Sequence, residues 1–461
     1  MPKARSNQNK KTIRKNTHYL SIFDDDGVVN YYGIPAILLN KTKILIYSPF
    51  SQKFALLPSI LLDKQETVQN LRKKGFFASI SFESDKLKKK KEINLALSVT
   101  TGCNQQCKYC FADTEFLGSK TLNLKGIIME PEAAIFIVKR LNLFFKIRSI
   151  DFLGGEPTTN IDAIKSAVSA VKAVNQNPVF IIQTNGIMPN YVLEYLIKEN
   201  FFLSVSWDGL KSNNLFRGCE GPKVEKNILK LVKSKARFKV HMTIGKWNIG
   251  KVLSSIKWLF SNGVKFIHLE PLKPLGMGKA LVNQVVSPEE FIRTYFRAVA
   301  LAEEKNKYIL NYAFVNLFSP NDYFCPTAAG NGFVFNPGGL ISGCYRVQKE
   351  NYAFAKSFSV GKWKKRNEQI NFNPAVFKRL DFKGSKFIPC KKCPFLYICS
   401  GGCPLNHLEF NPENTSFIRH IDPSVCDLRK GLITKAILLM YNYALRKKPH
   451  FLNGWEMFWQ R

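Results

Sequence analysis

The sequence has no apolar run long enough to cross a membrane. Its most apolar stretch near the end, from Leu432 to Leu445, is interrupted by Lys435, whereas a spanning helix needs about 20 predominantly apolar residues. Residues 1–16 are basic and polar and lack the apolar core of a secretory signal peptide. We therefore expect neither a transmembrane segment nor a secretory signal.

Acidic residues are scarce. The chain has 34 Asp and Glu against 68 Lys and Arg, which gives a formal net charge of +34. A charge of this size attracts nucleic acid, acidic peptides or an anionic membrane surface. The lysines are spread along the whole chain, many beside Asn, Ile and Phe, as a biased base composition would produce. The charge therefore selects no partner by itself, and nucleic acid is not the expected substrate.

Cysteine, in contrast, is plentiful, with 11 residues in the chain. Disulfides are typical of secreted proteins. This many cysteines without a secretory signal therefore indicate reduced thiolates that serve as metal ligands. The expected compartment is the cytoplasm, under low oxygen.

Three cysteines lie in one short loop, at 103, 107 and 110 within residues 101–111. An odd number of thiols leaves one unpaired if disulfides form, so the three favour a shared metal centre. Zinc would need a fourth ligand. A [4Fe–4S] cluster held by only three cysteines keeps one iron open to a reactant. Both kinds of site remain possible from this loop alone.

Strands and helices alternate from Ile93 to about Leu275, which favours a parallel sheet. Active sites of parallel barrels lie at the carboxyl ends of the strands. The expected strands are Leu95–Val99, Ser149–Leu153, Val179–Gln183, Leu203–Trp207, Lys239–Ile244 and Lys265–Leu269, and the helices between them are Glu132–Phe145, Ile161–Val174, Asn190–Lys198, Val224–Lys233 and Val252–Phe260. Ser287-Pro288-Glu289-Glu290 forms a capping box that starts a helix to about Asn306, and no further β–α unit is expected after it.

The spacing C-x3-C-x2-C before an aromatic residue resembles the radical S-adenosylmethionine (radical SAM) superfamily. A second motif, Gly154-Gly155-Glu156-Pro157, follows the second strand, 44 residues after Cys110. The resemblance implies an α/β fold with a partial (β/α)6 TIM-like barrel. It also implies a [4Fe–4S] cluster on Cys103, Cys107 and Cys110 that cleaves SAM reductively to a 5′-deoxyadenosyl radical.

The same resemblance implies how SAM is held. Gly154, Gly155, Glu156 and Pro157 would hold its amino group. Ser206 and Arg217 would contact its ribose and carboxylate, and a guanidinium suits a carboxylate because it donates two parallel hydrogen bonds. Tyr109 would lie along the adenine or pack in the core. Glu270 would face the cavity, and His268 is as well explained as a structural histidine.

Seven further cysteines follow the pattern C-x13-G-x4-C, then C-x2-C-x5-C-x3-C, then a single cysteine. This pattern resembles the SPASM extension of radical SAM proteins, which carries two auxiliary [4Fe–4S] clusters. A zinc-ribbon-like module is the alternative. The resemblance assigns the first auxiliary cluster to Cys325, Cys344 and Cys403, and the second to Cys390, Cys393, Cys399 and Cys426.

The chain departs from sulfatase-maturing enzymes at two positions. They have a further cysteine about six residues before Cys325, where this chain has Ser319, so the fourth ligand of the first auxiliary cluster is undefined, with Asp322 nearby. They also have a catalytic aspartate where this chain has Tyr345, followed by Arg346. A phenol is normally protonated at pH 7, so Tyr345 is a candidate catalytic residue of a different kind.

The remaining segments carry no specific motif. We expect a disordered tail over 1–16, an N-terminal α+β module over 17–92, the barrel over 93–306, a loop-rich SPASM domain over 307–430 and a C-terminal helix and tail over 431–461. The module is predicted to contain strands Ile34–Leu39, Lys43–Tyr47 and Lys53–Leu57 and a helix near Thr67–Lys74; it is a lid, a dimer module or a peptide-binding module. Lys86–Lys91 is expected to be a linker, Cys219 an idle thiol, and Phe451, Trp455, Phe458 and Trp459 to dock on the body.

The sequence thus predicts a radical SAM enzyme with a SPASM domain, one SAM-binding and two auxiliary [4Fe–4S] clusters, and a small electron donor such as flavodoxin or ferredoxin. The expected substrate is a peptide or protein. The alternatives are a sulfatase-type maturase, an enzyme acting on a small molecule or tetrapyrrole, and, in a different class, a nucleic-acid-binding iron–sulfur or zinc protein.

Overall fold

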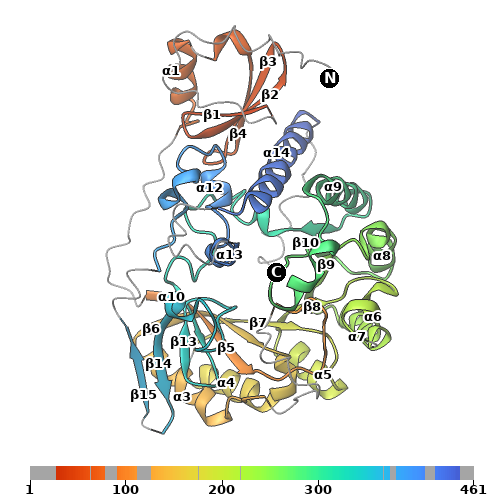
Figure 1. The fold of residues 1–461 in the computed structure, drawn as a ribbon, viewed down its shortest axis with the longest axis vertical. Helices are drawn as coiled ribbons and strands as arrows, with labels where there is room; N and C mark the ends of the chain where they lie inside the picture. The colour runs from red at the N-terminus through yellow and green to blue at the C-terminus, as the bar shows by residue number, and fades with distance from the viewer. Residues whose placement is uncertain are drawn as a thin grey trace, which may run out of the picture.

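The structure is a computed structural model, shown in Figure 1. It describes residues 27–62, 64–77, 91–111, 126–174, 176–218, 220–366, 368–373, 380–410 and 421–446. The basic tail, residues 86–90 of the expected linker, Cys219 and the terminal aromatic residues lie outside these ranges. Lys91, expected in the linker, is the first residue of a strand.

The N-terminal module is an antiparallel sheet of four strands in the order β1-β2-β3-β4, followed by a helix. Its elements are β1 (Val28–Tyr31), β2 (Ile34–Asn40), β3 (Lys43–Ser48), β4 (Lys53–Pro58) and α1 (Gln65–Lys73). The three predicted strands and the helix are confirmed, whereas β1 was not predicted. One face of the sheet packs with Leu71 of α1 and Phe76, which follows the helix, in a separate small core.

The other face of the module lies against the Cys-rich part of the chain (Figure 1). The Tyr47 hydroxyl donates to the carbonyl of Leu317 at 3.3 Å, and the rings of Phe54 and Tyr441 lie 5.6 Å apart. The Asn30 amide donates at 2.7 Å to the carbonyl of Lys392. The module is therefore docked on the body by both apolar and polar contacts.

The central sheet contains the six predicted parallel strands in sequential order. Each strand lies beside the next because each helix returns the chain to the end of the sheet where the strands begin. Both faces bury apolar residues, such as Phe152 on one face and Leu153 on the other. The strands are β5 (Lys91–Thr100), β6 (Phe145–Gly154), β7 (Val179–Thr184), β8 (Phe202–Ser206), β9 (Arg237–Ile244) and β10 (Phe266–Pro271); the helices are α3 (Pro131–Asn142), α4 (Ile161–Ala173), α5 (Asn190–Lys198), α7 (Gly221–Lys233) and α8 (Val252–Ser261). The predicted partial barrel is confirmed.

The sheet extends beyond the six strands at both sides. Helix α9 (Pro288–Glu304) begins at the predicted cap, where Ser287 accepts a hydrogen bond from the Glu290 amide at 3.2 Å. It leads to β11 (Tyr308–Leu310), which pairs in parallel with β10. This further parallel strand was not predicted, because a strand of three residues is too short to give a periodic signal. It leads to a single 3-10 turn and then to β12, so the expectation that no complete β–α unit follows is not contradicted in the described ranges.

At the opposite side, β12 (Gly332–Phe335) pairs in parallel with β5 and continues into three antiparallel strands. These are β13 (Leu340–Ser342), β14 (Ser359–Lys364) and β15 (Gln369–Phe372). The sheet of the barrel and the first part of the Cys-rich region are thus continuous, with 11 strands in all. The second cysteine pattern is thereby held next to the first strand of the barrel.

The described residues of the Cys-rich region also include the helices α10 (Ala355–Phe358), α12 (Leu396–Cys399), α13 (Pro404–Phe410) and α14 (Pro423–Leu445). The predicted C-terminal helix is confirmed as α14. Asp422 caps its first turn, since its side chain accepts from the Ser424 amide at 3.0 Å. It packs against α9, where the Tyr443 hydroxyl donates to Glu303 at 2.7 Å. None of the helices in the described ranges is long and apolar enough to cross a membrane.

Candidate active site and cysteine clusters

The first cysteine loop begins at the carboxyl end of β5. The Thr100 hydroxyl accepts from the Gly102 amide at 2.9 Å, which turns the chain out of the strand. Cys103, Cys107 and Cys110 follow, and burial, the Glu156 carboxylate and the other two thiols together raise the pKa of Cys103 to about 12. The Cys103 thiol therefore stays protonated by itself, whereas a bound metal centre would hold it as a thiolate.

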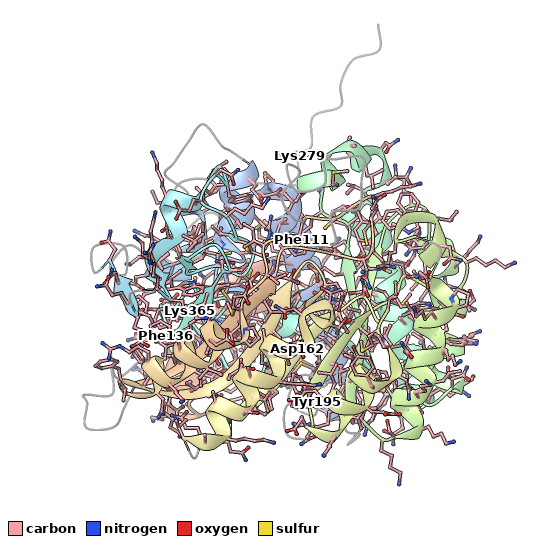
Figure 2. The ribbon with its side chains drawn as sticks, turned by 90° about the horizontal axis from the view of Figure 1, so that it is seen from below. Phe111, Phe136, Asp162, Tyr195, Lys279 and Lys365 are labelled. Atoms are coloured by element: carbon pink, nitrogen blue, oxygen red, sulfur yellow. The ribbon has the colours of Figure 1, made fainter. Side chains whose placement is uncertain are left out.

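The loop is covered on one side by the segment after β10. The Met277 amide of η4 (Gly276–Gln284) donates to the carbonyl of Cys110 at 2.9 Å. Phe111, at the end of the loop, is 53% exposed. Phe111 and Lys279 of η4 lie on the same face of the molecule (Figure 2). The cysteine loop is thus near the surface but anchored at both ends.

The Gly154-Gly155-Glu156-Pro157 turn lies directly against this loop. The Gly155 amide donates to Thr100 O at 3.0 Å, and the Glu156 amide donates to Gly102 O at 2.8 Å. Gly154 has a positive φ of 146°, and a Cβ on Gly155 would lie 2.3 Å from Gly102 O. Both glycines are therefore required for the close approach of the two segments.

The Glu156 side chain is only 1% exposed and binds groups of its own chain. It accepts from the Thr158 hydroxyl at 2.6 Å, the Thr184 hydroxyl at 2.7 Å and the Asn185 amide at 2.7 Å. The carboxylate therefore ties the end of β6 to the end of β7. The role of this segment in holding the SAM amino group stays a prediction.

Tyr109 and Arg217, both predicted to contact SAM, contact each other. Arg217 Nη1 donates to the Tyr109 hydroxyl at 2.6 Å, the hydroxyl is hydrogen-bonded to the Asp208 carboxylate, and Arg217 lies 3.9 Å from Asp208. Asp208 was not among the predicted SAM contacts. Its position at the end of β8 beside Ser206 was the available signal.

Two buried nitrogens near this cluster have no hydrogen-bond partner in the described part of the chain. They are Arg217 Nε and Gln105 Nε2. A buried donor without a partner is unfavourable, so a ligand with acceptor atoms, such as a carboxylate, would complete the site. These two unpartnered donors therefore fit a ligand such as SAM, which carries a carboxylate.

An aromatic stack extends from Tyr109. Its ring is stacked on Trp247 at 5.6 Å, and Trp247 is stacked on Phe216 at 4.2 Å. A Cβ on Gly245 would lie within 1.8 Å of the Trp247 ring. Trp247 and Phe216 were not predicted as site residues. The Gly245-Lys-Trp247 segment directly after β9 was the sequence feature that could have indicated this stack.

Ser206 is the last residue of β8 and lies in register with His241 of β9. Its neighbour Trp207 is fully buried and donates to Glu225 at 3.2 Å. The strand end therefore orients Ser206 and Asp208 to one side of the sheet and Trp207 to the other. The contact of Ser206 with ribose stays a prediction.

Tyr345 reaches from the Cys-rich region to the barrel strand β6. Its hydroxyl donates to Asp151 at 3.0 Å. Burial raises the pKa of Asp151 to about 6, although the hydrogen bond from Tyr345 and the charge of Lys239 act in the opposite direction. Burial lowers the pKa of Lys239 to about 8, opposed by the charges of Glu270 and Asp151. The structure thus places an acid, a base and a phenol together inside the barrel.

Glu270 lies on the neighbouring strand β10, next to this group. It contacts Lys273 at 2.8 Å and His268 at 3.3 Å. Burial alone would raise the pKa of Glu270, but Lys273 and His268 outweigh it and hold the pKa well below its usual range. His268 is fully buried, and burial lowers its pKa to about 4. Glu270 is therefore an ionised carboxylate and His268 a neutral structural histidine.

Cys325, Cys344 and Cys403 converge in the Cys-rich region. Burial and the thiols of Cys403 and Cys325 raise the pKa of Cys344 to about 12. Ser319 is exposed. Both carboxylate oxygens of Asp322 accept from Ser385, at 2.8 Å from its amide and 2.5 Å from its hydroxyl. Asp322 therefore ties two loops together, which leaves the thiols as the defined donors of this group.

Arg346 connects this region with the first cysteine loop. Its guanidinium contacts Glu409 of α13 at 2.5 Å and Asn406 at 2.7 Å, and it lies 5.7 Å from the centre of the Phe111 ring. These contacts of Arg346 were not predicted from the sequence. Its partners are about 60 residues or more away along the chain, so no local pattern could identify this contact.

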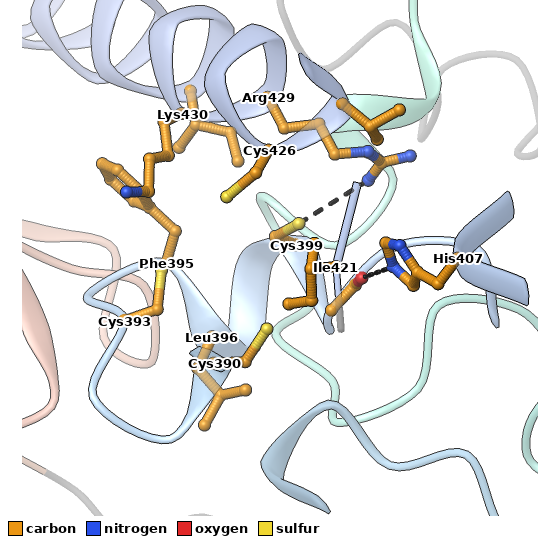
Figure 3. Close-up of a pocket in the computed structure, with 13 residues that line it drawn as sticks. Cys390, Cys393, Phe395, Leu396, Cys399, His407, Ile421, Cys426, Arg429 and Lys430 are labelled. Carbon is orange, nitrogen blue, oxygen red and sulfur yellow. Dashed lines mark hydrogen bonds between the residues drawn. The ribbon is translucent and has the colours of Figure 1, made fainter. Parts of the chain in front are cut away.

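The second group of cysteines surrounds a pocket (Figure 3). Its empty space, counted together with the solvent at its mouth, is about 400 Å³. Cys390, Cys393, Cys399 and Cys426 line it, with Arg429 and Lys430. His407 also lines it, but its two ring nitrogens are engaged with Gly401 O at 2.7 Å and the Asp422 amide at 3.2 Å.

The four thiols that the resemblance assigns to the second auxiliary cluster thus line one pocket, and their role as its ligands stays a prediction. No three Cys, His, Asp or Glu side chains within the described ranges lie close enough to hold a single metal ion. In a [4Fe–4S] cube each cysteine binds a different iron, so the sulfurs stand further apart than around one zinc ion. Cysteine thiolates suit an iron–sulfur cluster, and the auxiliary clusters stay a prediction.

The chain is similar to several known proteins. Residues 97–269 match the family model described as the Radical SAM superfamily. The chain is 26% identical to a probable GTP 3′,8-cyclase of Sulfurisphaera tokodaii, over 56% of this chain and 82% of that protein. It is also 26% identical to a cysteine-type anaerobic sulfatase-maturating enzyme of Clostridium perfringens, over 66% of this chain and 86% of that protein.

Two solved structures share the fold. One is anSMEcpe with bound AdoMet, with a TM-score of 0.61, 20% identity and coverage of 77% of this chain and 96% of that chain. The other is SuiB of Streptococcus suis bound to its precursor peptide SuiA, with a TM-score of 0.54, 13% identity and coverage of 84% and 97%. Both similarities bear out the barrel and its Cys-rich extension as a fold.

Proposed function

We propose, from the radical SAM domain that residues 97–269 form, that this protein is a radical SAM enzyme that modifies a peptide or protein substrate. The observation that carries the radical SAM assignment is the meeting of Cys103, Cys107 and Cys110 with the Gly154–Pro157 turn and a buried guanidinium whose Nε lacks a partner among the described residues. One loop would hold the cluster and the other groups would hold SAM.

The chain's own residues have defined tasks in this proposal. Cys103, Cys107 and Cys110 would hold a [4Fe–4S] cluster, which with SAM supplies a 5′-deoxyadenosyl radical that abstracts a hydrogen atom. Arg217 Nε would donate to the SAM carboxylate. Tyr109, stacked with Trp247, would place one edge of the adenine site.

The two further cysteine groups would hold auxiliary clusters. Four thiols around a pocket support the second cluster, and three converging thiols support the first. The first cluster would keep one iron open to substrate, because Asp322 is bound to Ser385. Tyr345 would act next to it as a neutral phenol, since burial first and then the Asp151 charge raise its pKa well above the usual value.

The peptide substrate is supported by the fold shared with SuiB and by the N-terminal module. Strands β1 and β4 are the two edges of its sheet. Three of the four residues of β1 are buried, whereas β4 has no buried residue and exposes 42% of Leu56. We propose that β4 is the edge to which an extended peptide adds by β-strand pairing.

A substitution on this edge tests the peptide proposal. Leu56→Lys should weaken retention of the substrate peptide about tenfold, because an apolar contact of order 1–2 kcal/mol is lost. Leu229→Lys is the matched control, since Leu229 has a similar exposure of 40% on α7. Mass spectrometry of peptides that co-purify with the anaerobic enzyme measures the effect, and equal loss in both variants would contradict the role of β4.

Cluster content and SAM cleavage test the enzyme class. Anaerobically reconstituted protein should hold about twelve irons, four for each of three cubes, and form 5′-deoxyadenosine with a reductant. Cys103→Ala should lose about four irons and all 5′-deoxyadenosine, with the auxiliary clusters retained. A total of four irons, or tightly bound zinc, would refute the cluster assignment.

The relatives favour a second candidate, an enzyme that acts on a small molecule, since one of them is a probable GTP 3′,8-cyclase. Added GTP tests this candidate, because a small-molecule enzyme would convert it without any peptide. The nucleic-acid alternative predicts binding of polynucleotides that falls steeply with salt. The enzyme would need a small electron donor, such as flavodoxin or ferredoxin, and the reducing cytoplasm that suits its thiols.

A further inference from the structure

Arg429 lies between the two groups of cysteines in the Cys-rich region. It is on α14, three residues after Cys426, and is only 7% exposed. Its Nη1 donates to the sulfur of Cys399 at 3.8 Å, a contact drawn in Figure 3. The guanidinium is therefore in direct contact with the donor set of the second auxiliary site.

The same guanidinium also lies next to two segments that carry cysteines assigned to the first auxiliary site. It lies 4.6 Å from the centre of the Phe324 ring, and Phe324 directly precedes Cys325. A Cβ on Gly402 would lie 3.7 Å from Arg429 Nε, and Gly402 directly precedes Cys403. The cation thus contacts segments that carry ligands of both sites, and the glycine leaves the space that it fills.

A buried cation at this position has a defined electrostatic effect. A cube with thiolate ligands is negatively charged and becomes more negative when it accepts an electron. In a water-poor interior the attraction of a nearby cation is stronger than in water, so the more negative state gains more. Hydrogen bonds to the sulfur ligands act in the same direction.

We propose that Arg429 is a shared positioning residue that raises the reduction potentials of both auxiliary clusters. This inference rests on the proposed function, since it requires that Cys325, Cys344 and Cys403 and the four thiols of the second site hold clusters. The inference assigns one side chain to both sites, so a substitution of Arg429 should change the reduction potentials of both clusters. A pair of clusters with raised potentials is suited to accept an electron from a substrate radical.

Redox titration followed by electron paramagnetic resonance tests the proposal. The titration uses the full chain with Cys103, Cys107 and Cys110 changed to alanine, so that only the auxiliary clusters give a signal. Arg429→Gln should lower both midpoint potentials by at least a tenfold change in the one-electron equilibrium, which is about 59 mV. Arg429→Lys, which keeps the charge, should lower them less.

Two substitutions on the same helix separate this effect from a general change of charge. The Lys430 charge acts on Cys390 and Cys393 of the second site, so Lys430→Gln should lower one potential only. Lys435 is exposed further along α14, so Lys435→Gln should change neither. If Arg429→Gln changes one potential or none, the shared role is refuted.

Iron content distinguishes failure of this inference from failure of the proposed function. Parent protein without about eight auxiliary irons would refute the cluster assignment itself. If Arg429→Gln does not bind iron, the charge-conserving variant Arg429→Lys is measured in its place. Loading of Arg429→Lys with potentials near those of the parent supports the electrostatic role, and loss of iron in this variant as well would show that shape rather than charge matters.

Discussion

The close contact between the Gly154–Pro157 turn and the cysteine loop gives a strong test of the active site. A methyl group added by Gly155→Ala would stand 2.3 Å from Gly102 O and 2.6 Å from Gly102 C. An ordinary contact is at least 3.4 Å, so the two segments would have to separate by roughly 1 Å. Both partners are backbone atoms, which cannot rotate away as a side chain can.

The expected cost follows from this geometry. Overpacking costs about 1–3 kcal/mol, and a clash with rigid backbone is expected at the upper end. Separation would also break the hydrogen bond from the Glu156 amide to Gly102 O, at 2.8 Å, which contributes about 1 kcal/mol. The sum of about 4 kcal/mol would fall on the segment that carries Cys103, and a displacement near 1 Å can reduce a rate about 100-fold.

The assay is the iron content and the rate of 5′-deoxyadenosine formation of the reconstituted variant. Gly155→Ala should lose about four irons, or keep them with a rate about 100-fold lower. Gly250→Ala is the control, since nothing lies within 4 Å of a Cβ at Gly250. An unchanged iron content and rate in Gly155→Ala would refute the close contact and the reasoning built on it.

Two further predictions concern buried polar groups. Tyr109→Phe removes the hydroxyl that joins Arg217 to Asp208 and leaves these two side chains with one hydrogen bond fewer. SAM binding, measured by calorimetry, should therefore weaken by about 1–3 kcal/mol. The control Tyr191→Phe, at an exposed position, should bind SAM as the parent does, and an unchanged affinity of Tyr109→Phe would show that these residues are not part of the SAM site. Asp151 has its pKa raised to about 6 by burial, so the folded protein holds a proton that the unfolded chain loses between about pH 4 and pH 6. In urea unfolding, Asp151→Asn should have the same free energy of unfolding as the parent below pH 4 and a higher one above pH 6, by about 1–3 kcal/mol. The Asn oxygen still accepts from Tyr345, so this hydrogen bond is kept. The exposed Asp162→Asn should show no such pH-dependent difference, and a stability difference for Asp151→Asn that does not change with pH would contradict the raised pKa of the buried carboxyl.

The sequence by itself determined the local features of the chain. The six β–α units, the cap at Ser287 and the C-terminal helix follow from apolar periodicity and capping residues, which act over a few positions. The grouping of ten cysteines into three sets is what the resemblance to radical SAM proteins with a SPASM extension implies, and it stays a prediction. Strand β11 was missed because three residues are too few to show a period.

Only the tertiary structure decided which polar side chains meet. Glu156 binds Thr184 and Asn185 at the end of the next strand, and Tyr109 binds Arg217, which is 108 positions away. Tyr345 is hydrogen-bonded to Asp151 across 194 positions, and Arg429 contacts both Cys399 and the Phe324 ring. These contacts depend on strand order and on the course of long loops. A side chain's partner over such distances is set by packing of the whole chain, which leaves no trace in local sequence.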